Sequence, residues 1–113
     1  MTKEPLVYIC HILEAIDYIE QFAAKHTRET IFEERMRYDA ILRNLQTMAE
    51  SSKRLPDSIK KVHSNIPWRD IAGFRNILVH EYLEGLDHDV VWRVITYELE
   101  ALKVAMLKEY VSL

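Results

Sequence analysis

Apolar residues recur at every third or fourth position through most of this chain, which is the spacing of one face of an α-helix. The first such run spans 5 to about 25. A turn at 27–29 follows, and then comes the sequence Thr30-Ile31-Phe32-Glu33, which has the form of a capping box. The pattern therefore predicts a second long helix that begins at this box and fades near 51–52.

The second half of the chain is predicted to hold one short helix, at 59–63, and two long ones. Pro67 disfavours helix at the residue before it and suits a first helical turn, so the next helix is expected from 67 or 68 to about 82. Asp87 is a suitable N-cap for a last helix from 88 to about 110. Strand-like alternation and internal repeats are absent. The pattern therefore predicts an all-α, up-down bundle of four long helices and one short helix.

A single domain, residues 1–113, needs one core, and each helix supplies an apolar stripe to it. Trp68 and Trp92 are expected to belong to this core rather than to stack on nucleic-acid bases.

Gly73 lies inside the third long helix, where the missing side chain would let another backbone approach closely. The positions predicted to be buried are, in chain order, Leu6, Ile9, Leu13, Ile16 and Ile19 or Glu20; Phe32, Met36, Ala40, Ile41 or Leu42, Leu45 and Met48; Ile71, Phe74, Leu78 and Tyr82; and Val91, Val94 or Ile95, Leu99, Leu102, Ala105 or Met106, and Val111.

Composition favours a soluble protein of the cytoplasm. Of the 113 residues, 49% are apolar and 29% are charged, which is ordinary for a globular domain. No apolar run approaches the roughly 20 residues of a membrane span, and the N-terminus lacks the pattern of a signal peptide. Cys10 is the single cysteine, so no intrachain disulfide can form. We therefore expect a cytoplasmic location and no membrane contact.

Charge and histidine spacing limit the classes of function. The formal net charge of −3 argues against a broadly basic surface that coats nucleic acid, although it leaves room for a local basic cleft. The histidines at 11, 26, 63 and 88 are scattered, with no pair at a metal-ligand spacing on one helix. A glycine-rich phosphate loop is absent. We therefore expect neither a metal site nor a bound cofactor.

The chemistry of the chain is concentrated in the third long helix. Arg75, Asn76, His80 and Tyr82 stand within eight residues of one another in an otherwise apolar run. On a helix, the asparagine and the histidine lie one turn apart on one face, and the long arginine side chain can reach toward the imidazole. A fixed cation beside a group that titrates near neutral pH is suited to handling phosphate esters.

The same four side chains also have ordinary structural interpretations. A lone histidine on an apolar helix is usually a structural residue. Arg75 would need an ion-pair partner, such as Glu50 or Asp70, if it were buried. Asn76 would bond to the backbone of a neighbouring helix, and Tyr82 would be a core residue with its hydroxyl at the rim.

The chain resembles the HepT-like family of HEPN-domain ribonuclease toxins in the run Arg75-Asn76-x-x-x-His80-x-Tyr82, preceded by Ile66-Pro67-Trp68-Arg69-Asp70-Ile71-Ala72-Gly73-Phe74. The family hallmark is R-N-x-x-x-H-x-Y after a P-W-x-x-I-x-G-F lead-in. The segments 39–45 and 89–92 also resemble the second and last helices of the family. One departure is Met48-Ala49-Glu50-Ser51 where the family often has I-G-E-A, so the carboxylate is kept and the glycine is lost.

The resemblance implies a HEPN-like, homodimeric endoribonuclease that cleaves RNA without a metal ion. In that scheme Arg75 and His80 carry the cleavage, and Asn76 supports them. The toxin is paired with an antitoxin, a small MntA-like nucleotidyltransferase, which is expected to silence it by transferring AMP to Tyr82.

Physical reasoning adds one condition to this scheme. Metal-free cleavage needs a base for the 2′-hydroxyl, an acid for the leaving oxygen and positive charge on the phosphorane. One copy of the motif offers a single histidine, and Arg75 lies about 140° round the helix from it. We therefore hypothesise that a two-fold dimer combines two motifs in one cleft. The alternative is a non-catalytic helical module, in which Arg75 and His80 hold a nucleotide or a partner protein.

Overall fold

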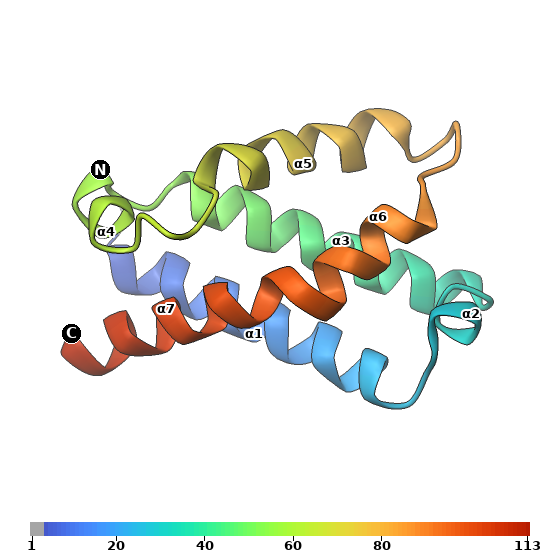
Figure 1. Ribbon diagram of the computed structural model, residues 1–113, viewed down its shortest axis with the longest axis horizontal. Coiled ribbons are helices and arrows are strands. Elements are labelled where there is room, and N and C mark those ends of the chain that lie inside the picture. The colour runs from blue at the N-terminus through green and yellow to red at the C-terminus, as the bar shows by residue number, and fades with distance from the viewer. Residues whose placement is uncertain (1–3) are drawn as a thin grey trace.

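The computed structural model describes residues 4–113, and regular secondary structure in this range is entirely helical (Figure 1). Four long segments run along the molecule in alternating directions, while two short helices lie at its opposite ends. In chain order the elements are α1 (Pro5–Ala24), α2 (Arg28–Ile31), α3 (Arg35–Lys53), α4 (Asp57–Val62), α5 (Trp68–Glu81), α6 (His88–Arg93), the π-helical turn η1 (Val94–Glu98) and α7 (Leu99–Ser112). The predicted all-α, up-down bundle is confirmed. Because α6, η1 and α7 follow one another without a gap, they form the last long helix, and α2 is a short helix that was not expected beside α4.

The core lies between α1, α3 and α7, and α5 packs on the outer side of α3. Trp68 and Trp92 are half-buried against it, as predicted. No helix within residues 4–113 has both the length and the hydrophobicity that spanning a bilayer requires. The side chains that are almost fully shielded from solvent are mostly branched aliphatic residues, namely Ile9, Ile12, Ile16, Ile19, Ile31, Ile41, Leu45, Met48, Val91, Leu102 and Met106.

The start of α3 differs from the prediction. The capping box expected at Thr30 and Glu33 is absent; instead Thr27 and Thr30 form a reciprocal box that opens the short helix α2, where a turn was predicted. Glu34 then caps α3 by accepting from the amides of the second and third residues after it, at 3.0 and 3.2 Å. Thr27 and Thr30 have the spacing of three that a reciprocal box requires, so a separate short helix forms before α3 begins.

The other end of α3 also departs from the prediction. The helix passes the position where it was expected to fade, and both Ser51 and Ser52 are buried inside it. The Ser52 hydroxyl donates to the carbonyl of Met48 at 2.8 Å, so this serine satisfies its polar group within the helix and does not end it.

Three predicted core positions are wrong, and the open alternatives are resolved, with Ile19 rather than Glu20 buried. Met36 is 79% exposed because it stands in the first turn of α3, outside the packed face, and Val111 is 83% exposed near the end of α7. Leu6 is also on the surface, while Leu13, Phe32, Ala40, Ile71 and Tyr82 are half-buried. Both members of each pair Ile41/Leu42 and Ala105/Met106 are buried, and Val94 is buried in preference to Ile95.

The last long helix contains a wider turn. It was predicted to run unbroken from 88 to about 110, but Val94–Glu98 form a π-helical turn in which the amide of Leu99 donates to the carbonyl of Val94. Residues five apart differ by about 140° on an α-helix. The wider turn reduces this difference, so Val94 and Leu99 both face the core.

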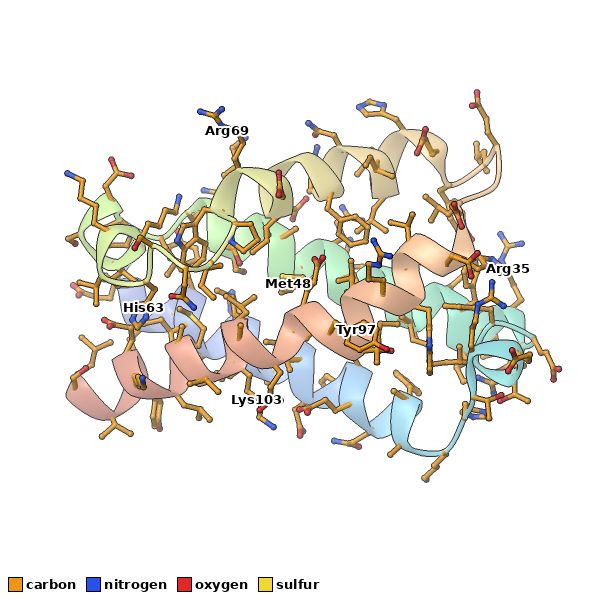
Figure 2. The ribbon with its side chains drawn as sticks, viewed as in Figure 1. Arg35, Met48, His63, Arg69, Tyr97 and Lys103 are labelled. Atoms are coloured by element: carbon orange, nitrogen blue, oxygen red, sulfur yellow. The ribbon has the colours of Figure 1, made fainter. Side chains whose placement is uncertain are left out.

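The start of α5 is anchored at the end of the bundle that holds α4. The indole N–H of Trp68 donates to the carbonyls of Lys60 and His63 at 3.2 and 3.1 Å. His63, labelled in Figure 2, is buried, and its Nε2 lies 2.8 Å from a carboxylate oxygen of Glu109 on α7. These bonds position the connection between α4 and α5 against the last helix.

Two α3 variants test this description of the core. Leu45→Ala is expected to lower the free energy of unfolding by about 2–5 kcal/mol, because it empties a fully buried site. Met36→Ala is the matched control, and its exposed position predicts a change within about 0.5 kcal/mol. Urea unfolding followed by circular dichroism measures both. Equal losses in the two variants would contradict the packing described here.

Candidate functional site

The outer face of α5 is free of the bundle. Phe74 and Leu78 are the buried residues of this helix, and they point toward the core. On the opposite side Arg69, Asn76 and His80 are exposed, and Figure 2 shows Arg69 projecting away from the other helices. The motif predicted from the sequence therefore lies on a helix that is anchored along one side and open to solvent along the other.

Arg75 is turned toward α3, where it pairs with Glu50. Its Nε donates to Oε1 of Glu50 at 3.2 Å, and the two side chains are 38% and 43% exposed. Gln46 donates to the same carboxylate oxygen at 3.2 Å. The Gln46 bond, together with the bond and charge of Arg75, lowers the pKa of Glu50, so this residue is a carboxylate at neutral pH. The ordinary interpretation of Arg75 is thus confirmed, with Glu50 and not Asp70 as its partner.

Asn76 contacts the Arg75 side chain by a hydrogen bond, whereas His80 does not. The Oδ1 of Asn76 accepts from Nη1 of Arg75 at 3.4 Å, and its side chain is exposed, so the predicted bond to the backbone of a neighbouring helix is not formed. Among residues 4–113, no group hydrogen-bonds to the exposed imidazole of His80. Nε of Arg75 is held toward α3 by Glu50, while its Nη1 extends to Asn76, the residue one turn before His80.

Tyr82 stands just beyond the last residue of α5, as its C-cap, and its hydroxyl is held by α3. The hydroxyl donates to a carboxylate oxygen of Asp39 in a short hydrogen bond. Nη2 of Arg35 donates to the same hydroxyl oxygen at 2.6 Å, while its Nε lies 3.1 Å from both oxygens of Asp39. The guanidinium also lies 5.3 Å from the centre of the Tyr82 ring. The rings of Tyr38 and Tyr82 stack with their centres 6.4 Å apart. The half-buried tyrosine with its hydroxyl at the rim is confirmed.

The protonation states in this contact follow from its hydrogen bonds. The bond from Tyr82 is the largest cause of the lowered pKa of Asp39, and the bonds from Arg35 add to it. The same bond to Asp39 raises the pKa of Tyr82. The site therefore holds a carboxylate and a neutral phenol at physiological pH.

Sequence reasoning did not assign Arg35 and Asp39 to the site. Their spacing of four on one helix was a visible signal for an ion pair. What joins them to Tyr82 is the antiparallel packing of α3 and α5, which brings the start of α3 next to the end of α5.

Two grooves flank α5. A shallow groove of about 310 Å³ separates it from α3 and is lined by Asp39, Leu42, Arg43, Gln46, Leu78, Val79 and Tyr82. A larger, mainly apolar groove of about 600 Å³ separates it from the last long helix, and Gly73, Phe74, Ile77, Val90 and Val94 are among its lining residues.

Gly73 is open in this chain. Apart from its chain neighbours and the backbone of its own helix, a methyl group placed on it would meet no atom within 4 Å, so the predicted close approach of another backbone does not occur within residues 4–113. Ala49, which replaces the glycine of the family pattern on α3, is fully buried and therefore fits the packed core.

Comparison with known proteins agrees with the motif. The model of the family described as “Ribonuclease HepT-like” matches residues 12–108. A protein of Thermococcus cleftensis named “Probable ribonuclease HepT” is 37% identical over 91% of this chain and 93% of its own length. A protein of Methanocaldococcus jannaschii named “Gamma-glutamylcyclotransferase and putative RNase” is 32% identical over 96% of this chain, and the chain spans about half (48%) of that protein. No solved structure matches the chain significantly.

The family match includes α3, α5 and the connections between them, so it takes in every residue of the candidate site. The likeness to the Thermococcus cleftensis protein covers nearly the full length of both chains. On these grounds the chain belongs to the HepT-like ribonuclease family.

Proposed function

We propose that this chain is a metal-independent endoribonuclease, the toxin of a toxin–antitoxin pair, and that its active unit is a homodimer in the cytoplasm. The observation that carries the proposal is the distribution of the motif over α5. Arg75 and His80 are both accessible to solvent, yet they lie on different sides of the helix and do not meet within one chain. Family membership supports RNA as the substrate.

A second copy of α5 supplies what one chain lacks. In a two-fold dimer with the outer faces of α5 side by side, two imidazoles and two guanidinium groups would enter one cleft. Gly73, which no side chain or other helix among residues 4–113 covers, gives the second helix room to approach.

The cleavage step then needs only groups of these two chains. One His80 takes the proton of the ribose 2′-hydroxyl, whose oxygen attacks the neighbouring phosphorus. The bond from phosphorus to the 5′-oxygen breaks, and the other His80 gives that oxygen a proton, leaving a 2′,3′-cyclic phosphate. Arg75 holds the phosphate by charge-assisted hydrogen bonds after it leaves Glu50, and Asn76 orients the phosphate or the imidazole.

Silencing would act through Tyr82. The cognate antitoxin, an MntA-like nucleotidyltransferase, transfers AMP to its hydroxyl. The added phosphate and nucleoside would enter the groove between α3 and α5, which runs from Tyr82 past Arg43 and Gln46. Gln46 shares the carboxylate of Glu50 with Arg75, so the nucleotide would compete with RNA for Arg75 from that side.

A non-catalytic binding module is the second candidate. The observation that favours it is the ion pair of Arg75 with Glu50, because a guanidinium that is already neutralised attracts RNA phosphate less strongly. In this case the dimer would be only an assembly unit, and the motif would hold a nucleotide or a partner protein.

Cleavage assays with excess EDTA separate the two candidates. The purified chain is expected to cut RNA under these conditions, and His80→Ala is expected to lose about 10²-fold or more of the rate, the range found for proton-transfer groups. His11→Ala, which removes another exposed histidine, is the matched control and should cut normally. Absence of cleavage together with tight nucleotide or partner binding would select the binding module.

Mixed dimers test the shared cleft. Wild-type and His80→Ala chains with different affinity tags can be co-expressed and the heterodimer isolated. We expect its cleavage rate to fall far below half that of the wild-type dimer, because either the acid or the base is missing from the cleft. Full cleavage by the heterodimer, or by a stable monomer, would rule out the composite site.

Tyr82→Phe separates cleavage from silencing. RNA cleavage is expected to stay within a few-fold of wild type, while co-expression with the active nucleotidyltransferase no longer relieves growth arrest. The removed hydroxyl bonds predict a loss of about 1 kcal/mol in stability. If the nucleotidyltransferase still silenced the variant through its catalytic activity, Tyr82 would not be the acceptor.

A further inference from the structure

The contact between Tyr82, Asp39 and Arg35 has more hydrogen bonds than are needed to hold α5 against α3. The arginine and the aspartate on α3 already form an ion pair one helical turn apart. The tyrosine hydroxyl is added to this pair at the rim of a groove, where water could satisfy it equally well. Its only proton is directed at the carboxylate, and the guanidinium donates a hydrogen bond to its oxygen.

We propose that Asp39 is the general base that accepts the phenolic proton of Tyr82 when this hydroxyl is nucleotidylated, so that the toxin itself supplies part of the chemistry of its silencing. The inference rests on the proposed function of Tyr82 as the AMP acceptor. Arg35 acts as a positioning residue, because its Nε bonds to both oxygens of Asp39 and holds the carboxylate in place.

The step is balanced with a nucleoside triphosphate as the co-reactant. The Tyr82 oxygen attacks the α-phosphorus of ATP, and the bond from this phosphorus to the β-phosphate bridging oxygen breaks. Pyrophosphate leaves with the bonding electrons, and the phenolic proton passes to Asp39. A phenol–phosphorus ester and a protonated carboxyl group remain, and the carboxyl group then loses its proton to water.

The electrostatics of the contact give a reason for a built-in base. Because Asp39 raises the pKa of Tyr82, the hydroxyl is not ionised in advance and must lose its proton as the new bond forms. The lowered pKa of Asp39 keeps this side chain ionised at neutral pH, so its carboxylate is free of a proton when the reaction begins. As the phenol oxygen bonds to phosphorus, its proton becomes far more acidic. The proton, which stays on Tyr82 in the resting state, then passes to the carboxylate of Asp39.

The position of the contact is compatible with an external enzyme. The side chains of Arg35 and Asp39 are 71% and 45% exposed, and Figure 2 shows Arg35 at the end of the molecule near α2. Arg43 lines the same groove one turn further along α3 and adds positive charge for the phosphates of the incoming nucleotide.

The test measures transfer of α-labelled AMP from ATP by the purified cognate nucleotidyltransferase. Asp39→Asn keeps the size and a hydrogen-bond acceptor but removes the base, so we expect the single-turnover rate to fall about 10²-fold with little change in KM. Asp39→Glu should recover part of this loss. Asp17→Asn, which changes an exposed aspartate on α1, is the matched control and should behave as wild type. Thermal melting confirms that each variant is folded.

The pH profile distinguishes a base from a merely structural residue. The wild-type rate should be nearly flat above the ionisation of Asp39, whereas the Asp39→Asn rate should rise with pH as hydroxide or ionised Tyr82 takes over. Equal rates and equal profiles for a folded Asp39→Asn variant would overturn the inference while leaving Tyr82 as the acceptor. If wild-type protein is labelled elsewhere, or if Tyr82→Phe is labelled normally, the proposed silencing fails first and the role of Asp39 falls with it.

Discussion

The antiparallel packing of α5 on α3 is the contact from which the candidate site is built. α5 is anchored chiefly along this one helix, and each polar residue of the site that faces inward finds its partner there. Near one end Glu50 meets Arg75, and near the other Asp39 meets Tyr82. A rotation of α5 by a single residue, about 100°, would break both contacts together.

The same packing divides the motif into two chemical environments. Arg75 and Tyr82 face α3 and are held by carboxylates, while Asn76 and His80 remain toward solvent. The imidazole of His80 is open to an incoming molecule, and the guanidinium of Arg75 is held in a defined position by Glu50. The arrangement therefore gives each residue type the surroundings that suit its chemistry, but in separate places within one chain.

Periodicity was sufficient to predict the helices and their inward faces, because the repeat of 3.6 residues is a local property. It was insufficient at the ends of helices, where Met36 satisfies the spacing but the packed face has not yet begun. Periodicity was also insufficient to predict which side chains of different helices contact each other. Asp39 and Tyr82 are 43 residues apart in sequence, so their contact depends on how far one helix slides along another, which no local pattern encodes.

The motif itself can be recognised in the sequence because its polar side chains interrupt an apolar helix. The family match agrees with the resemblance that the motif shows. Charge alone offers Glu50 and Asp70 as partners for Arg75, and the structure selects Glu50. The roles of Arg75, Asn76, His80 and Tyr82 in cleavage and silencing stay predictions, since they depend on a second chain, on RNA and on the nucleotidyltransferase.

The π-helical turn at Val94–Glu98 has a consequence for how the chain tolerates change in length. In a regular α-helix an added residue rotates everything beyond it by about 100°, which would expose the apolar stripe that follows. The wider turn takes up one extra residue locally. Each half of the last helix therefore keeps an inward apolar face across a one-residue insertion, with Val91 before the turn and Leu102 after it both buried in the core.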